Sequence, residues 1–301
     1  MLRRILRNAS EWVLLRSGAA KRGRRRHRDD VVILAYHNVV PDDARPAGDR
    51  SLHLPLRSFR DQLDHLEAIH EVVPLEALDR PTRGRPRAAI TFDDAYAGAL
   101  ELAVPELVDR GMPASVFVCP GLLGEPGFWW DRLAPETEGA SLDPDVRATA
   151  LDDLQGRQHV ILERFESAPE DAWWMRPGDE RAVVRAAGRP GITIACHTWA
   201  HPNLTALSRD DVASELERTV RWIGDHAGDH GIPHHLSFPY GLYDDATVEI
   251  ADDLGFEALY RIEGGVAGRP DRTPWVAPRV NIPSGVSRGG FELRASGVRR
   301  W

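Results

Sequence analysis

Two pairs of residues in this 301-residue chain have the types and the spacing that metal chemistry needs. Asp93 and Asp94 are adjacent, and His197 and His201 lie four positions apart. Two neighbouring carboxylates repel each other unless a cation lies near one of them. Two imidazoles and one carboxylate form a three-ligand site with open positions for water and substrate, which is a catalytic pattern. The alternative for the acidic pair is a cap on the following helix, which would explain one Asp better than two.

The histidine spacing is weak evidence by itself, because the chain contains 12 histidines. One turn of helix would bring residues four apart onto one side, but the same spacing recurs at His226, His230 and His234. That second stretch contains two glycines and a proline, which disfavour a helix, and it does not follow a predicted strand. We therefore interpret residues 226–234 as a solvated loop rather than a metal site.

Apolar runs predict the elements that position these residues. Unbroken apolar segments are typical of parallel strands that are buried on both faces. Strands are predicted at 31–36, 87–92, 114–119, 191–196 and 235–238, with short extended pieces around 256–261 and 276–282. Helices are predicted at 58–70, 97–110, 208–226 and 244–254. Strands that alternate with helices indicate an α/β fold with a parallel sheet, either open or closed into a barrel.

Polar residues follow the ends of four of these strands. His37 follows the first strand, the Asp pair the second, His197 the fourth, and Tyr240 lies two residues beyond the fifth. Because the carboxyl ends of parallel strands form the functional face of such folds, we expect these residues to meet on one rim. The sequence contains no Gly-rich phosphate loop, which disfavours a nucleotide-binding sheet.

The chain is predicted to contain one catalytic domain, residues 31–301, with a helical insertion at about 125–190. The insertion is rich in charged residues and in tryptophan, with Trp129, Trp130, Trp173 and Trp174. Tryptophans can stack on sugar rings, although most of them pack in cores. Trp199, which lies between the two histidines, is the tryptophan that we expect to line the cleft.

Composition and charge exclude other classes of protein. The chain is 42% hydrophobic, which is enough for one large core. Residues 1–28 carry ten Lys or Arg and one Glu, about +9, so the rest of the chain carries about −17 of the total net charge of −8. Such an acidic body argues against a nucleic-acid-binding domain. Cys119 and Cys196 cannot form a disulfide framework and are predicted to be buried free thiols.

The basic segment 1–30 is interpreted as a tail or as an amphipathic helix. Its apolar residues have helical spacing with arginines between them, at Leu2, Ile5, Leu6, Ala9 and Val13. Residues 1–28 are therefore a candidate contact with an anionic membrane, and the alternative is a solvated arm or a helix packed on the domain. Neither a secretory signal nor a bilayer-spanning stretch is evident, so we expect a cytoplasmic protein, with peripheral attachment to the inner face of the membrane as the variant.

Four segments resemble the motifs of one family. Thr91-Phe92-Asp93-Asp94 and His197-Thr198-x-x-His201-Pro202 are similar to the two defining motifs of the polysaccharide deacetylase family, carbohydrate esterase family four. Residues 114–118 resemble the strand between them, and Ser237-Phe238-Pro239-Tyr240-Gly241 resembles the third motif. The resemblance covers about residues 31–285. It implies a distorted (β/α) barrel that hydrolyses the acetamide of N-acetylglucosamine-type residues in a glycan or glycoconjugate.

The resemblance also implies a role for each motif residue. Asp93 would be the general base, and Asp94, His197 and His201 would bind a divalent metal, most often zinc. The metal would lower the pKa of its water and polarise the acetyl carbonyl, and Asp93 would take the proton of that water. The oxyanion would be held by the metal and by the backbone N–H of Tyr240. The leaving amine then needs a proton from a general acid.

The general acid is the first departure from the family pattern. Many members use a histidine near the C-terminus, but the last histidine of this chain is His235. His37, in Tyr36-His37-Asn38-Val39, resembles the N-terminal histidine of the permuted branch of the family, which includes exopolysaccharide deacetylases and uses that residue as the acid. The alternative is that His37 only bonds its own loop.

Two further positions differ from the family pattern. The usual glycine after the Asp pair is Ala95, which would be costly if its backbone were left-handed. In many members the third motif begins with an arginine that pairs with the base, whereas this chain has Ser237 there. Arg279, near the end of another predicted strand, is our hypothesis for the missing partner.

Three other functions fit the sequence less well. A catalytically impaired deacetylase that only binds glycan is favoured by Ala95 and Ser237 but opposed by the intact base and metal residues. A two-carboxylate glycosidase leaves the histidine pair without a role. Two histidines and one Asp also suit a non-haem iron oxygenase, but the alternation of strands and helices argues against that class.

Overall fold

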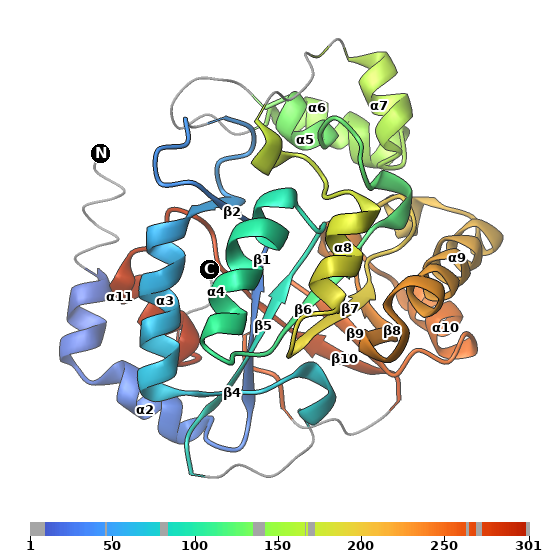
Figure 1. Ribbon diagram of the computed structural model, residues 1–301. Helices are drawn as coiled ribbons and strands as arrows, with labels where there is room; N and C mark the ends of the chain where they lie inside the picture. Colours follow the sequence, from blue (N-terminus) through green and yellow to red (C-terminus); the bar gives the residue numbers. More distant parts are fainter. Residues whose placement is uncertain are drawn as a thin grey trace.

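The computed structural model describes residues 10–45, 47–78, 84–134, 142–165, 167, 172–262, 265–268 and 273–298. Its centre is a parallel sheet in the order β10-β9-β8-β7-β6-β5-β1-β11, with β4 beside the start of β5 (Figure 1). The strands are β1 (Val31–Tyr36), β4 (Glu71–Val72), β5 (Arg87–Phe92), β6 (Ala114–Val118), β7 (Ile192–Cys196), β8 (Gly231–Ser237), β9 (Ala258–Arg261), β10 (Trp275–Pro278) and β11 (Val280–Asn281). A separate parallel pair joins β2 (Asn38–Val40) to β3 (His53–Pro55). The predicted α/β fold with a parallel sheet is therefore confirmed.

The sheet forms a nearly closed barrel. β10 pairs with β9 at one end of the strand order, and β11 pairs with β1 at the other end. Only Arg279 separates β10 from β11, so the chain itself brings the two edges of the sheet together. The N–H of Arg279 donates to the carbonyl of Arg261 at 2.8 Å, and the N–H of Ile282 donates to that of Ala35 at 3.0 Å. A residue at this seam is within reach of strands on both sides.

Both faces of the sheet are buried, because alternate side chains enter two different cores. β1 and β5 are buried at every position. Val32 and Leu34 of β1 pack in the larger core, whereas Val31 and Ile33 pack in a smaller one. The smaller core also contains side chains from five further strands: Ala89, Phe117, Ala195, Ala258, Tyr260, Trp275 and Ala277. This smaller core therefore fills the interior of the barrel, as packed side chains do in closed parallel sheets.

Helices surround the barrel (Figure 1). They are α3 (Leu56–Ile69), α4 (Val104–Asp109), α8 (Glu180–Ala187), α9 (Arg209–Ala227), α10 (Asp245–Asp253) and α11 (Arg288–Ala295). The predicted helix at 97–110 contains a π-helical segment, Ala99–Ala103, before α4 begins. Side-chain caps fix the first turns of two long helices: Ser208 accepts the N–H of Asp211 in α9, and Asp244 forms a capping box with Thr247 in α10.

The segment between β6 and β7 is largely helical, as predicted for residues 125–190. It contains α5 (Trp129–Arg132), α6 (Pro144–Ala148) and α7 (Gln158–Arg164), which lie together at the top of Figure 1. α8 follows them and packs Ala182, Val183 and Ala186 into the larger core. The limits of the insertion, and the division of the chain at residue 30, stay predictions.

The interpretation of residues 226–234 as a solvated loop was wrong. His226 lies in the last turn of α9, where its Nδ1 donates to the carbonyl of Trp222 at 2.8 Å, and His234 lies within β8. The helix ends at Ala227 and is followed by Gly228, whose φ is 51°. Pro233 is tolerated in β8 because the pairing with β7 shifts register there, so no regular ladder bond is lost.

Other predictions concern the cysteines and the N-terminal segment. Cys119 and Cys196 are buried free thiols, as predicted. Residues 10–16 are helical and α2 spans Ala19–Arg26, whereas the apolar positions predicted at residues 2–9 lie outside the described residues. Within the described ranges, no helix combines the length and the apolar character needed to cross a membrane.

Candidate metal centre

The residues at the strand ends have unusual backbone geometry. Asp94 and Ala95, directly after β5, have φ angles of 68° and 53°. In the loop after β7, Thr198 and His201 have φ angles of 67° and 55°, and Tyr240 after β8 has 56°. Left-handed backbone is costly for residues other than glycine, and such strain tends to gather at functional sites. The cost that we expected for Ala95 therefore applies, and strain marks the rim that the three motifs share.

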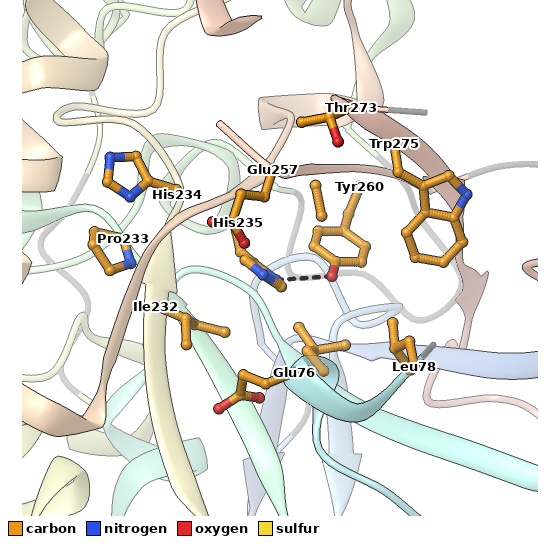
Figure 2. Close-up of a pocket in the computed structure, with 12 residues that line it drawn as sticks. Glu76, Leu78, Ile232, Pro233, His234, His235, Glu257, Tyr260, Thr273 and Trp275 are labelled. Carbon is orange, nitrogen blue, oxygen red and sulfur yellow. Dashed lines mark hydrogen bonds between the residues drawn. The ribbon is translucent and has the colours of Figure 1, made fainter. Parts of the chain in front are cut away.

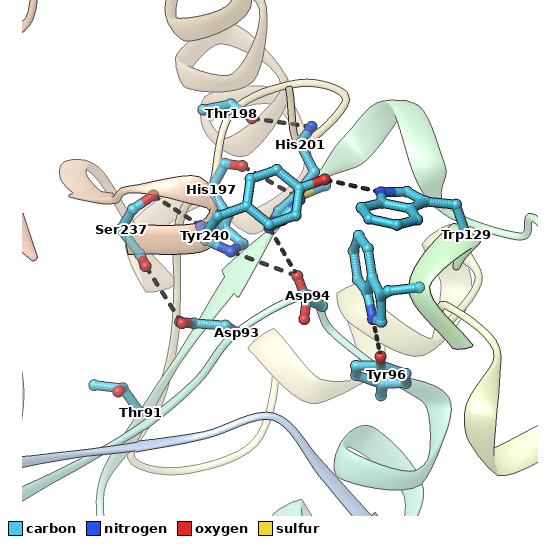
Figure 3. Close-up of polar contacts among 12 residues, drawn as sticks. Thr91, Asp93, Asp94, Tyr96, Trp129, His197, Thr198, His201, Ser237 and Tyr240 are labelled. Atoms are coloured by element: carbon cyan, nitrogen blue, oxygen red, sulfur yellow. Dashed lines mark hydrogen bonds and ion pairs between the residues drawn. The ribbon is translucent and has the colours of Figure 1, made fainter. Parts of the chain in front are cut away.

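Asp94, His197 and His201 form a compact group of metal-ligating side chains (Figure 3). One ligand atom from each residue lies within 4.8 Å of the others. Oδ1 of Asp94 lies 3.5 Å from Nε2 of His197 and 3.3 Å from Nε2 of His201. All three residues are buried. Among the described residues, this is the one group of three or more such side chains with this geometry.

This donor set fits a divalent cation. Oδ1 of Asp94 is buried and accepts no hydrogen bond from any residue that the structure describes. Buried polar atoms are normally hydrogen-bonded, so a carboxylate oxygen that faces only two imidazole nitrogens is a specific reason to expect a cation. Two histidines and one carboxylate are a ligand set of catalytic zinc sites, which keep a position open for water or substrate.

The third motif orients one of the two imidazoles. Nδ1 of His197 donates to the backbone carbonyl of Ser237 at 2.8 Å. A carbonyl can only accept, so this bond places a proton on Nδ1, and the ring can offer the lone pair of Nε2 to a cation once Nε2 is unprotonated. Burial lowers the pKa of His201 to about 3, so this ring is neutral and can also offer a lone pair.

Asp93 lies outside this group and forms a buried ion pair with Arg279. Nη1 and Nη2 of Arg279 donate to Oδ1 and Oδ2 of Asp93 at 2.8 and 2.7 Å. Nη2 also donates to Oγ of Ser237 at 2.6 Å, and Nη1 to Oγ1 of Thr91 at 3.1 Å. Burial alone would raise the pKa of Asp93, but the guanidinium outweighs it and holds the pKa well below its usual range. The predicted contact of Arg279 with the carboxylate is therefore present.

The structure brings all six predicted site residues to one cavity of about 250 Å³. They are His37, Asp93, Asp94, His197, His201 and Tyr240. The ring of His37 makes no hydrogen bond to another described residue, so the alternative of a histidine that bonds its own loop finds no support. The hydroxyl of Tyr240 accepts a bond from Nε1 of Trp129 at 2.9 Å, which fixes that ring at the cavity wall (Figure 3).

The prediction that Trp199 lines this cleft was wrong. Trp199 packs on the other side of its loop, where the guanidinium of Arg218 lies 4.1 Å from the ring centroid. The left-handed backbone of Thr198 turns the loop, so that the indole of Trp199 lies on the opposite side from the two imidazoles. Trp130 lines the cavity instead, and its ring centroid lies 4.9 Å from that of His201.

A carboxylate on α9 holds the loop between the two metal-ligating histidines. Oε2 of Glu215 accepts the backbone N–H of Ala200 at 2.8 Å. Burial raises the pKa of Glu215. The carbonyl of Trp199 accepts the N–H of Gly121 at 2.8 Å, so the loop is also held from the segment after β6. Sequence reasoning missed this support, because Glu215 is one of several acidic residues on an ordinary amphipathic helix.

A buried polar network connects the cavity wall to the segment that carries His37. The carboxylate of Asp131 accepts three bonds: from the N–H of Asp49 at 2.8 Å, Nε2 of His53 at 3.0 Å and the hydroxyl of Tyr96 at 2.7 Å. Tyr96 accepts Nε1 of Trp130 at 2.7 Å, and His53 accepts the side-chain amide of Asn38 at 3.0 Å. Sequence reasoning missed this network, because its members are scattered along the chain and none has a recognisable spacing.

A separate cavity shares no lining residue with the one that contains Asp94, His197 and His201 (Figure 2). Its volume is about 640 Å³, and it is lined by residues at the amino ends of β8, β9 and β10. His235 and the hydroxyl of Tyr260 are hydrogen-bonded there at 2.9 Å. No described group of three metal-ligating side chains lies in this cavity. The candidate metal ligands lie instead in the cavity of about 250 Å³ at the carboxyl ends of the strands.

Comparisons of sequence agree with the motifs. The sequence profile of the family described as polysaccharide deacetylase matches residues 80–259. The protein YxkH of Bacillus subtilis (strain 168) is 22% identical over 268 residues, which cover 86% of this chain and 74% of that protein. The chitin deacetylase of Amylomyces rouxii is 32% identical over 127 residues, which cover 42% of this chain and 28% of that protein.

Comparisons of structure agree with the fold. The Streptococcus pyogenes deacetylase PplD, solved with acetate, superposes with a TM-score of 0.61 at 17% identity, over 88% of this chain and 98% of that chain. IcaB from Ammonifex degensii superposes with a TM-score of 0.61 at 20% identity, over 90% of this chain and 98% of that chain. At these identities the likeness establishes the barrel fold alone.

Proposed function

Because this chain belongs to the polysaccharide deacetylase family, we propose that it hydrolyses the N-acetyl groups of N-acetylglucosamine-type residues with a divalent metal, zinc in the first instance. The observation that carries this proposal is the buried group of Asp94, His197 and His201 beside a separate, ionised Asp93. One carboxylate is thus available to hold the cation and the other to move a proton. The substrate class is a glycan or glycoconjugate that carries acetamido sugars.

The metal, when bound by these three residues, would lower the pKa of a water and polarise the acetyl carbonyl. Asp93 is then the proton acceptor. Oδ1 accepts one hydrogen bond, from Arg279, and so keeps a lone pair for another donor, whereas Oδ2 accepts from both Arg279 and Oγ of Ser237. Arg279 keeps the carboxylate ionised and fixes its plane. Ser237, which stands where many family members have the arginine of the third motif, accepts a hydrogen bond from the guanidinium.

His37 is proposed as the general acid, in the manner of the permuted branch of the family. It lines the same cavity as Asp93, and no bond to another described residue occupies its ring. It would donate a proton to the leaving amine, without which the C–N bond breaks slowly. Tyr240 is proposed to contribute its backbone N–H to the oxyanion, because this residue has left-handed backbone and lies at the cavity wall.

Acetate release tests this function. Metal-depleted protein is incubated with an N-acetylglucosamine oligomer in the presence of zinc, of cobalt or of no metal, and acetate and free amine are measured. The proposal expects acetate and amine in equal amounts, dependence on added metal, and loss of turnover in Asp93→Asn. Glycan binding without acetate under all metal conditions would instead assign the chain as an impaired, glycan-binding member of the family.

A further inference from the structure

The basic N-terminal segment has no role in the proposed reaction, yet the structure anchors part of it to the body. The helix over residues 10–16 is joined to α2 by Ser17 and Gly18. Several small and apolar side chains pack together where these helices meet the C-terminal segment: Leu14, Leu15, Ala19, Ala20, Leu293 and Val298. Glu11 is buried and accepts a hydrogen bond from the hydroxyl of Ser287. The two helices therefore have a fixed position on the body.

The same short helix presents apolar side chains to solvent. Trp12 and Val13 are 58% and 56% exposed, the two highest values among the exposed large hydrophobic residues that the structure describes. The guanidinium of Arg16 lies 4.7 Å from the ring centroid of Trp12. Tryptophan and arginine side chains each combine an apolar part with a polar or charged group. Such side chains are typical of the membrane–water interface.

α2 supplies positive charge next to this helix. Residues 16–28 contain seven Lys or Arg and no Asp or Glu. Arg22 donates to the carbonyl of Ser17 at 2.6 Å and so bridges the turn between the two helices. Lys21, Arg25 and Arg26 are exposed and make no ion pair with a residue that the structure describes. Their charge is therefore available to an anionic partner.

We propose that residues 10–28 form a docking surface for an anionic phospholipid membrane. Trp12 and Val13 would enter the interfacial layer, and the cations of α2 would contact lipid phosphates. Charge alone would also suit nucleic acid, or the acidic body of a second copy of this chain. Neither of those partners explains two neighbouring apolar side chains that are exposed beside the arginines, whereas a bilayer takes up both features.

Vesicle binding by the full chain tests this surface. Vesicles of phosphatidylcholine, alone or mixed with phosphatidylglycerol, are sedimented with the protein at low and high salt. The proposal expects binding to the mixed vesicles only, weakened by salt because the attraction is screened. The double variant Arg25→Gln/Arg26→Gln should bind roughly 25-fold more weakly, since each basic residue near an anionic surface contributes about a fivefold gain.

Apolar insertion is tested separately. Trp12→Ser/Val13→Ser should also bind the mixed vesicles more weakly, and brominated lipid should quench less tryptophan fluorescence in Trp12→Phe than in the original chain. Matched controls are Trp173→Ser, at a residue that is 45% exposed, and Arg181→Gln/Arg189→Gln, at two exposed arginines within α8 and just after it. All variants should keep their activity on soluble oligomers, so failure of this proposal is distinguishable from failure of the proposed function.

Three outcomes would overturn the docking surface. One is equal binding to neutral and anionic vesicles, or binding to neither. The second is a loss of binding in the control variants as large as in the α2 variant. The third is self-association without lipid that disappears in Arg25→Gln/Arg26→Gln, which would assign the surface to a second copy of the chain.

Discussion

Asp93 and Arg279 each lie buried, and each offsets the charge of the other. Both carboxylate oxygens and both terminal guanidinium nitrogens take part in the pair. Removal of one partner from a buried pair leaves the other charge unpaired, which typically costs about 3–5 kcal/mol of stability. Without the guanidinium, burial would raise the pKa of Asp93. At the scale of single residues, this pair therefore sets the pH below which the proposed base stops working.

Replacement of the guanidinium should move this pH. In Arg279→Gln the pKa of Asp93 rises, so the acidic limb of kcat/KM against pH shifts to higher pH. Arg279→Lys keeps a positive charge and should shift the limb less. Urea unfolding of the same proteins separates lost stability from a changed pKa. An unshifted acidic limb in folded Arg279→Gln would remove Arg279 from the mechanism.

Replacement of the proposed acid, His37, should lower turnover without changing zinc affinity. His37→Asn should lower turnover roughly 10²–10⁴-fold, because the leaving amine loses its proton donor, while zinc affinity stays near that of the original chain. His230→Gln, an exposed histidine far along the chain, is the matched control and should change neither quantity. The acid assignment fails if turnover survives in His37→Asn, or if zinc affinity falls in parallel with it.

At the scale of elements, α9 positions the loop that carries two of the three proposed metal ligands. Glu215 accepts the N–H of Ala200, and Arg218 packs on Trp199. Left-handed backbone at Thr198 and His201 makes the loop strained, so its shape depends on such support. The loop is therefore pre-formed by contacts outside the cavity.

Loss of this support should weaken metal binding. Glu215→Ala is expected to lower zinc affinity about 10–100-fold, the usual effect of removing a residue that orients a metal ligand. Glu215→Gln keeps an acceptor oxygen and should recover part of the affinity. Glu217→Ala, at an exposed position of the same helix, is the control. Competition with a chromogenic chelator measures the affinities, and equal values for Glu215→Ala and Glu217→Ala would exclude the positioning role.

Sequence patterns predicted most of the elements, and the places of the candidate site residues at the strand ends, because both signals are local. The strand ends at His37, Asp94 and His197 follow from apolar runs of five or six residues. The pairing of Arg279 with Asp93 spans 186 positions, so sequence could offer it only as a hypothesis. Pro233 and the neighbouring glycines concealed the start of β8, because an irregular ladder tolerates a proline that a regular one would not.

Tertiary geometry accounts for what the sequence could not reveal. The side of the loop on which Trp199 lies depends on the left-handed backbone of Thr198, which no residue pattern predicts. The network of Asp131 with His53 and Tyr96 joins three separate segments through single hydrogen bonds. Such contacts arise only once the barrel has brought those segments together.

At the scale of the whole molecule, the buried His70 and the half-buried His235, both outside the candidate metal centre, link stability to pH. His70 donates from Nε2 to the carbonyl of Ala295 at 3.0 Å, and His235 bonds the hydroxyl of Tyr260. Burial lowers the pKa of each to about 4. An unfolded histidine titrates near 6.5, so between about pH 6.5 and 4 the unfolded chain binds protons that the folded chain does not. Stability is therefore present above this window and falls as the pH falls through it.

The size of this effect can be measured by urea unfolding at pH 7.5 and pH 5. Each histidine contributes a loss on the order of 2 kcal/mol over this interval. His70→Gln and His235→Gln should each reduce the difference between the two pH values, whereas His230→Gln should leave it unchanged. A difference that is the same in all four proteins would show that these histidines titrate normally in the folded state.

Zinc titration of the metal-depleted chain, followed by calorimetry, distinguishes the two tasks proposed for the adjacent carboxylates of Asp93 and Asp94. We expect one zinc per chain in the original protein and in Asp93→Asn. We expect that binding to be lost in Asp94→Ala, because Oδ1 of Asp94 faces both imidazoles and has no hydrogen-bond partner among the described residues. Tight one-to-one binding that persists in Asp94→Ala but disappears in Asp93→Asn would contradict the assignment of metal ligand and base.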